Sequence, residues 1–271
     1  MAVHNFDKFN DMRKINDQET VHEILLNIAK VFHNICLENN IPYYMIGGTL
    51  LGAIRHRGFI PWDDDMDFGV PRDYFNILKT VLKKELQFPY KLLTFEESPA
   101  LITDFIKISD DRTVVSEQYK EDIENFGFNI DIFPLDKSTL PNWRTNFCSS
   151  LLKLQGYRFL SYKRRPLLKK TVALFIKSAL FWMKKDFIIK ITNRMLISGK
   201  GNYMTNIYGS YGKREIVPTE YFGTPRLYDF EDTKLYGTEQ PSEYLTAIYG
   251  NYMGLPPEDK RHFHIENAFW K

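Results

Sequence analysis

The sequence predicts a mixed fold of helices and strands, α/β or α+β, over about its first 140 residues. Apolar residues recur at helical spacing near the N-terminus, and short segments with strand signals alternate with helical ones after it. The composition, 44% hydrophobic and 26% charged, is typical of a globular protein and excludes a disordered one. A chain of 271 residues can bury a sizeable core and fits one large domain or two modest ones.

The first predicted element is an amphipathic helix over residues 17–39. Thr20 and Glu23 resemble a capping box at its start, and Pro42 follows its end. Cys36 lies on the apolar face and is predicted to be a small buried thiol, with a disulfide as the weaker alternative. The apolar residues of this face are Ile24, Ile28, Val31, Phe32 and Ile35.

Shorter elements alternate after this helix. Pro71 is expected at the first position of a helix, where its missing N–H is no loss. The two predicted helices are Thr49–His56 and Pro71–Leu86. The predicted strands are Tyr43–Ile46, Asp65–Val70, Tyr90–Phe95, Phe105–Ile108 and Phe128–Phe133.

Three segments divide the chain. Residues 1–140 are predicted to form the core. Residues 141–200 contain a stretch without strand signals, 143–198, and are predicted to be helical. Residues 201–271 are rich in Tyr, Gly and Pro and are expected to form a loop-rich segment that packs on the core.

Charge is segregated along the chain. Residues 144–200 hold fourteen Lys or Arg residues against one acid, Asp186, which makes this segment about +13 and the rest about −11. A basic segment of this kind favours an anionic partner. Nucleic acid is the less favoured partner, because no recognised nucleic-acid-binding module accompanies the charge.

Within residues 167–191, lysines and large apolar residues fall on separate helix faces. The stretch carries too much charge for a transmembrane helix. It is predicted to lie on an anionic membrane surface, with a helix packed on the core as an equal alternative. The N-terminus has no apolar signal stretch, so we expect a cytoplasmic protein with peripheral contact to the inner membrane face. The two faces repeat every seven residues, at Lys170, Lys177 and Lys184 and at Leu174, Phe181 and Ile188.

Four aspartates stand close together in the segment PWDDDMDF. On a strand, Asp63, Asp65 and Asp67 would share one face while Asp64 points away. Three carboxylates on one face repel each other unless a cation lies between them, and oxygen ligands suit Mg²⁺ or Mn²⁺. An exposed acidic turn is the alternative. The alternation of Asp65 and Asp67 with apolar residues favours the metal site.

Two short motifs precede this segment. Gly47, Gly48 and Thr49 lie between a predicted strand and a predicted helix, where backbone N–H groups can approach a phosphate closely. Cationic side chains follow, and guanidinium groups match the geometry of phosphate oxygens. They are predicted to clamp a diphosphate, although a solvated helix end explains any one of them almost as well. These residues are Arg55, His56 and Arg57.

A further carboxylate is expected from a neighbouring strand. Asp131 lies inside the otherwise apolar segment FNIDIF, where a carboxylate without a partner or a metal would be unfavourable. Asn129 shares its face and is a candidate for contact with a substrate. A buried Asp131 paired with an arginine is the alternative.

Three blocks of the sequence resemble the LicD-type phosphocholine transferases, a branch of the nucleotidyltransferase-fold proteins that includes fukutin-like enzymes. The blocks are GGTLLGAIRHRGFIPWDDDMDFGVPRDY at 47–74, FNIDIFPLD at 128–136 and EYLTAIYGNYMGLPPEDKR at 243–261. The resemblance therefore spans nearly the whole chain. It implies an α+β fold with a nucleotidyltransferase-like mixed sheet, a helical insertion and a loop-rich C-terminal segment.

The resemblance also implies a chemistry. Asp65, Asp67 and Asp131 would be catalytic, and together with Asp63 they would hold Mg²⁺ or Mn²⁺. The donor would be CDP-choline, and the acceptor a sugar hydroxyl of a teichoic acid or another surface glycan precursor, such as a lipid-linked one. Transfer of ribitol phosphate, conventional nucleotidyl transfer and an inactive nucleotide-binding scaffold are the alternatives. Several aromatic residues could hold the choline, and the sequence does not select among them: Trp62, Tyr208, Tyr211, Tyr249 and Tyr252.

Overall fold

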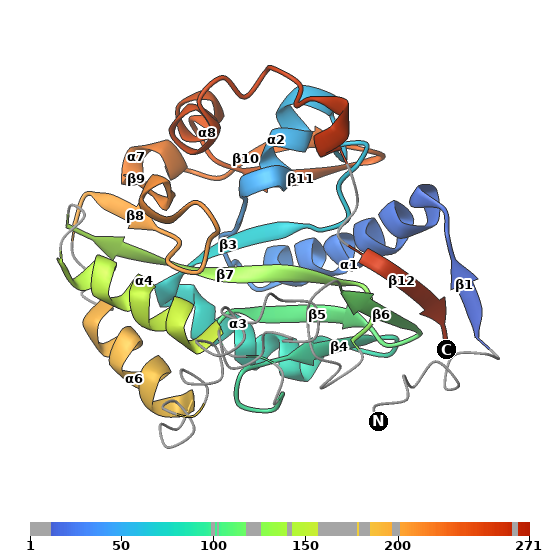
Figure 1. Cartoon of the computed structure of the whole chain (residues 1–271), viewed down its shortest axis with the longest axis horizontal. Coiled ribbons are helices and arrows are strands. Elements are labelled where there is room, and N and C mark those ends of the chain that lie inside the picture. The colour runs from blue at the N-terminus through green and yellow to red at the C-terminus, as the bar shows by residue number, and fades with distance from the viewer. Residues whose placement is uncertain are drawn as a thin grey trace.

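The computed structural model describes residues 12–98, 101, 103–117, 126–139, 143–156, 178, 185–196, 201–261 and 265–271. They form an α+β fold, as the sequence predicts (Figure 1). The helices are α1 (Gln18–Glu38), α2 (Gly47–His56), α3 (Arg72–Glu85), α4 (Trp143–Gly156), α6 (Lys185–Leu196), α7 (Thr219–Phe222) and α8 (Pro241–Tyr249), with short 3₁₀ turns at Gly212–Glu215 and Glu258–Lys260. The strands are β1 (Arg13–Ile15), β2 (Tyr44–Met45), β3 (Asp67–Pro71), β4 (Tyr90–Leu93), β5 (Ile106–Asp110), β6 (Thr113–Glu117), β7 (Asn129–Ser138), β8 (Tyr203–Thr205), β9 (Ile216–Pro218), β10 (Arg226–Phe230), β11 (Thr233–Gly237) and β12 (Ile265–Trp270).

A mixed sheet crosses the middle of the molecule in the order β2-β3-β7-β5-β4 (Figure 1). β3 and β7 run parallel, whereas β2 is antiparallel to β3 and β5 is antiparallel to both β7 and β4. The C-terminal half of β7 also pairs with β8, which pairs with β9. β7 is therefore the central strand, and β3 and β5 flank it.

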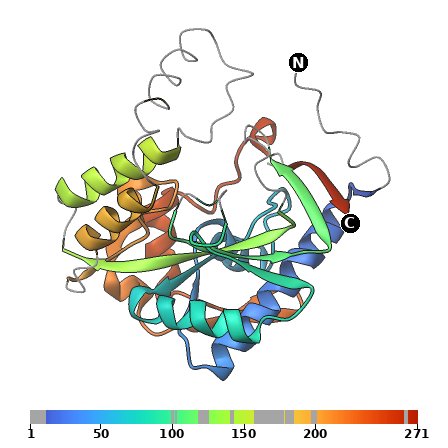
Figure 2. The ribbon, with the colours of Figure 1, turned by 90° about the horizontal axis from the view of Figure 1, so that it is seen from below.

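Helices α1 and α3 cover one face of this sheet (Figure 2). α1 buries Leu25, Ile28 and Phe32 completely. Its N-cap is Asp17, whose side chain accepts the N–H of Thr20 at 2.8 Å. The predicted capping box at Thr20 is therefore wrong, because the cap lies three residues earlier.

Several element boundaries differ from the sequence-based prediction. α2 begins at Gly47 rather than Thr49, so the glycine pair belongs to its first turn. β3 begins at Asp67 rather than Asp65, and α3 begins at Arg72, with Pro71 as its N-cap. β7 continues to Ser138, because its last residues pair with β8.

The C-terminal part contains strands that the sequence did not predict. β10 and β11 form a hairpin, and β12 joins β1 and β6 in a second, three-stranded sheet. α8 packs against α2 above the central sheet (Figure 1). Side chains of this part, including Phe230, Leu235, Leu245 and Ile248, belong to the main hydrophobic core.

The helical prediction for residues 143–198 is confirmed where the structure describes them, in α4 and α6. These two helices pack against each other on the side of the sheet opposite α1 and α3 (Figure 2). Ile188, one residue of the predicted apolar face, is buried in α6. Lys170, Lys177 and Lys184 lie outside the described residues, so contact with an anionic membrane stays a prediction. In the described part of the chain, no helix is long and apolar enough to cross a membrane.

Candidate functional site

Three charged side chains lie in one row across the middle of the central sheet. Asp67, the first residue of β3, is in register with Asp131 of β7, and Asp131 is in register with Lys107 of β5. Residues in register on neighbouring strands project from the same face of a sheet. The row therefore places two carboxylates and one ammonium group side by side.

The acidic segment before β3 adds to the negative charge of this row. Burial, followed by repulsion from Asp65, Asp131 and Asp63, raises the pKa of Asp67 well above its usual value. Asp63, Asp65, Asp67 and Asp131 therefore lie close enough to act on one another, as the sequence predicts. Asp64 points away: it is buried, and its carboxylate accepts the N–H of Ile265 at 2.9 Å.

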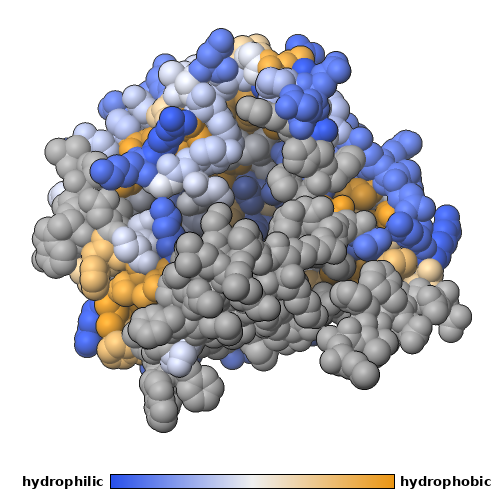
Figure 3. All heavy atoms as spheres, viewed as in Figure 1, coloured by the Kyte–Doolittle hydropathy of each residue, from blue (hydrophilic) through white to orange (hydrophobic). Residues whose placement is uncertain are grey.

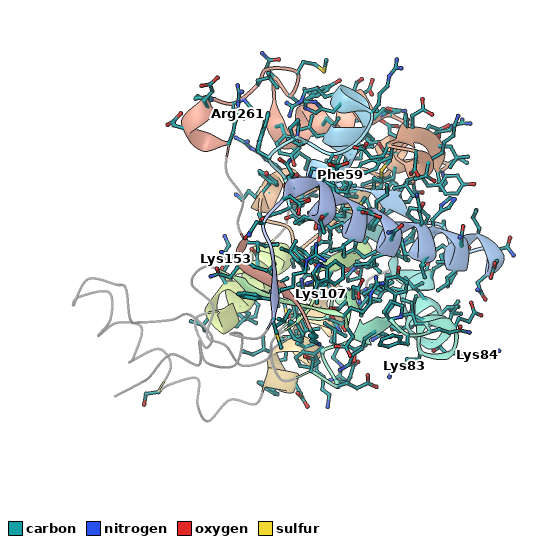
Figure 4. All side chains as sticks on the ribbon, turned by 90° about the vertical axis from the view of Figure 1, so that its right-hand side faces the viewer. Phe59, Lys83, Lys84, Lys107, Lys153 and Arg261 are labelled. Atoms are coloured by element: carbon teal, nitrogen blue, oxygen red, sulfur yellow. The ribbon has the colours of Figure 1, made fainter. Side chains whose placement is uncertain are left out.

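Lys107 is a residue of the site that the sequence analysis missed. Its ammonium group forms an ion pair with Asp131 and donates to Asn129 Oδ1 at 2.8 Å. Only 9% of the residue is exposed, and Figure 4 labels it among the other side chains near the middle of the view. The expected alternative for Asp131, pairing with an arginine, is thus replaced by pairing with a lysine. A charged residue inside the apolar segment FIKI was the available signal.

Lys107 is expected to stabilise the folded chain by partly compensating the negative charge of the neighbouring carboxylates. Because its removal leaves the partly buried charge of Asp131 without a partner, Lys107→Met should lower the free energy of unfolding by ~3 kcal/mol. Lys83→Met is the control, since Lys83 pairs with Glu97 on the surface (Figure 4) and such pairs contribute little. Urea denaturation of both variants measures the difference. Equal losses would contradict a compensating role for Lys107.

The glycine pair at the start of α2 lies against two of the carboxylates, and Gly48 gives Asp63 room. A Cβ on Gly48 would lie 2.9 Å from Asp63 Oδ2, and one on Gly47 would lie 3.5 Å from Asp67 Oδ2. Gly47 also has a φ of +54°, which favours glycine. Thr49 has a contact of its own, because its hydroxyl accepts the N–H of Asp67 at 2.8 Å. The N-terminal turn of α2 and the carboxylates are therefore neighbours.

The predicted cationic clamp lies at the other end of α2. Arg55 comes eight residues after Gly47, which is about 12 Å along a helix. Its guanidinium donates to the carbonyl oxygens of Tyr252 at 2.8 Å and Gly254 at 3.3 Å, and its Nε donates to His56. Arg57 is the left-handed, exposed residue that ends the helix. The structure thus does not bring these three residues together with Asp67 at the N-terminus of α2.

A buried glutamate, Glu215, lies close to the N-terminal end of α2, because Tyr244 interacts with both Glu215 and Gly47. Burial raises the pKa of Glu215 from its ordinary value of 4.5 to about 7. Tyr211 and Tyr244 face it, and burial raises the pKa of both phenols above their usual value of 10, so both stay neutral at pH 7. Glu215 is therefore a group near α2 whose charge changes in the neutral range.

Glu215→Gln is expected to change the pH dependence of stability. A carboxyl whose pKa is raised by folding stabilises the folded chain below pH 4.5, and this contribution is lost as the pH rises through about 7. The variant should therefore melt a few degrees above the unmodified chain at pH 8, and no higher near pH 4. Melting curves across this range measure the effect, with Glu220→Gln on the exposed face of α7 as control. A pH-independent difference would contradict the raised pKa.

The residues present suit a divalent cation by their chemistry. Carboxylate oxygens are the ligands that Mg²⁺ and Mn²⁺ prefer. The repulsion that raises the pKa of Asp67 is what a cation would relieve. In the described residues, no three acidic, histidine or cysteine side chains converge as a ready-formed metal site, and Asp131 is held by Lys107. Figure 3 shows a hollow with hydrophilic side chains at its bottom, below the part of the molecule that carries α2 and α8.

A family model and three known proteins match this chain, one of them over most of its length. The family model "LicD/FKTN/FKRP, nucleotidyltransferase domain" matches residues 40–152. The lipopolysaccharide cholinephosphotransferase LicD of Haemophilus influenzae is 34% identical over 263 residues, which cover 91% of this chain and 95% of that protein. Uncharacterized proteins RP689 of Rickettsia prowazekii and RT0683 of Rickettsia typhi are 41% and 38% identical over 66 and 68 residues, about a quarter of this chain and of each of theirs.

Proposed function

Because this chain belongs to the LicD family and is a transferase, we propose that it moves phosphocholine from CDP-choline to a sugar hydroxyl of a surface glycan precursor. The observation that supports this is the identity of 34% over 91% of the chain with a lipopolysaccharide cholinephosphotransferase. A lipopolysaccharide precursor is therefore the first acceptor to test, and a teichoic acid precursor is the second.

In this reaction the carboxylates and the first turn of α2 would have different roles. Asp63, Asp65, Asp67 and Asp131 would hold Mg²⁺ or Mn²⁺, which would neutralise charge on the diphosphate. The N-terminal turn of α2 lies beside Asp63 and Asp67 and would bind phosphate oxygens through its N–H groups. The donor diphosphate would thus lie between the helix and the strand.

Asp131 would accept the proton of the acceptor hydroxyl in this proposal. In the reaction, the acceptor oxygen bonds to the phosphorus of phosphocholine, and the bond from that phosphorus to CMP breaks. The hydroxyl proton would pass to Asp131, a general base in this role. Lys107 and Asn129 would position it, because Lys107 bridges both side chains.

Transfer and thermal-shift measurements on the purified chain separate this proposal from the alternative donors and from a scaffold without activity. The purified chain should transfer labelled choline phosphate and release CMP in Mg²⁺, and CDP-choline should raise its melting temperature more than CDP-ribitol does. A larger shift with CDP-ribitol would favour polyol phosphate transfer. Release of pyrophosphate from CTP would favour nucleotidyl transfer. Binding of a CDP donor without turnover on either acceptor would favour a scaffold.

A further inference from the structure

Three tyrosines gather beside the N-terminal turn of α2. The rings of Tyr211 and Tyr249 stand almost perpendicular, with centroids 5.0 Å apart and planes at 77°. The hydroxyl of Tyr244 accepts the N–H of Gly47 at 3.3 Å. The hydroxyl of Tyr249 lies 3.7 Å from the point that a Cβ on Gly47 would occupy, and Asp67 Oδ2 lies 3.5 Å from the same point. The aromatic corner formed by Tyr211, Tyr244 and Tyr249 therefore adjoins the proposed phosphate position.

A buried carboxylate lies against this aromatic corner. Glu215 is 7% exposed, and its Oε1 accepts the N–H of Tyr211 at 3.4 Å. Gly209 makes room for it, since a Cβ there would lie 2.2 Å from the same oxygen. Among the described residues, no lysine, arginine or histidine forms an ion pair with Glu215. An ionised carboxylate without a neighbouring cation is unfavourable in a buried site. A bound cationic ligand would therefore stabilise the ionised form of Glu215.

The combination suits one kind of cation. A quaternary ammonium has no N–H to donate, so it is bound by the faces of aromatic rings and by a nearby negative charge. Tyr211 is 43% exposed, so this side of the corner is in contact with solvent. In choline phosphate only two carbons separate the ammonium from the phosphate oxygen, so the two groups need adjoining sites. The corner and the first turn of α2 adjoin in this way, because Tyr244 and Tyr249 both reach Gly47.

We propose that Tyr211, Tyr249 and Glu215 form the subsite for the trimethylammonium group of the donor. This rests on the proposed function, and it adds the residues that distinguish choline from an uncharged polyol. Tyr211 and Tyr249 present aromatic surface, and Glu215 supplies the negative charge. Tyr244 is a positioning residue that ties the corner to Gly47.

Binding of CDP-choline and of CDP alone, measured by calorimetry on the full chain, tests the subsite. Tyr211→Leu removes a ring at an exposed position, and Glu215→Gln removes the charge while keeping an acceptor oxygen for the N–H of Tyr211. Each should weaken CDP-choline binding roughly tenfold and leave CDP binding unchanged. Tyr211→Phe should bind CDP-choline like the unmodified chain, because the aromatic face remains.

Matched controls lie away from the site. Tyr74→Leu on α3 and Glu220→Gln on α7 replace partly exposed residues of the same types and should change neither affinity. If Tyr211→Leu and Glu215→Gln bind CDP-choline as tightly as the unmodified chain, or lose CDP to the same degree, the subsite is overturned and the proposed function stands. If the unmodified chain prefers CDP-ribitol and transfers no choline phosphate, the proposed function fails first.

Discussion

Asp67→Asn is expected to abolish transfer and leave the fold intact. Asp67 stands where β3, β7 and the first turn of α2 meet, and it is surrounded by Asp63, Asp65 and Asp131. Loss of a ligand to a cation that offsets the diphosphate charge should lower turnover by roughly 10³-fold or more. Stability should hold or rise in metal-free buffer, because the substitution removes one of several neighbouring like charges. Steady-state rates and melting curves on one preparation measure both.

Asp229→Asn is the matched control, since Asp229 lies on the exposed strand β10 and pairs with Lys234 on the surface. It should leave both the rate and the melting temperature close to those of the unmodified chain. Near-normal turnover by Asp67→Asn in Mg²⁺ would remove Asp67 from the reaction. A large loss of stability would mean that its carboxylate is needed for folding.

The sequence predicted the acidic part of this site because the signal there is local. Asp63, Asp65 and Asp67 stand within one short segment, and Asp65 and Asp67 alternate with apolar residues. Asp131 stood out as a carboxylate in an apolar strand. The register of β3 with β7 brings Asp67 and Asp131 together. This agrees with the expectation of a carboxylate from a neighbouring strand.

The parts that the sequence analysis missed depend on contacts between distant segments. Lys107 joins the site only because β5 pairs with β7, and its partners lie more than twenty positions away. β12 pairs with β1, from the other end of the chain. No local sequence pattern predicts such pairings, so the sequence predicts a loop-rich segment where the structure has these C-terminal strands.

The position of Arg55 shows that residues close in sequence need not lie close together in space. Arg55, His56 and Arg57 lie in sequence between the glycine pair and the acidic segment. This position is what favours the prediction that they clamp a diphosphate. Because α2 already begins at Gly47, these residues fall on its last turn. Arg55 instead fixes the turn at residues 252–254 through two carbonyl oxygens. The helix start, two residues earlier than predicted, helps to set the separation.

Removal of divalent cations is expected to abolish transfer completely and reversibly. The candidate ligands Asp63, Asp65, Asp67 and Asp131 are all oxygen donors, and oxygen donors favour Mg²⁺ and Mn²⁺ over zinc. Activity should therefore vanish in excess EDTA and return with either cation, but not with Zn²⁺ alone. Full activity in a metal-stripped preparation would contradict the metal assignment.

A second readout of the same prediction does not depend on turnover. Mg²⁺ should raise the melting temperature of the unmodified chain, because a cation bound only to the folded chain stabilises it and relieves the repulsion around Asp67. Asp67→Asn should show a much smaller shift, whereas Asp229→Asn should show the full one. Lys107 already supplies one positive charge to Asp131, so Lys107→Met should bind Mg²⁺ more tightly while being less stable without it. If Mg²⁺ raised the melting temperature of the unmodified chain and of the three variants equally, any bound cation would lie away from Asp67.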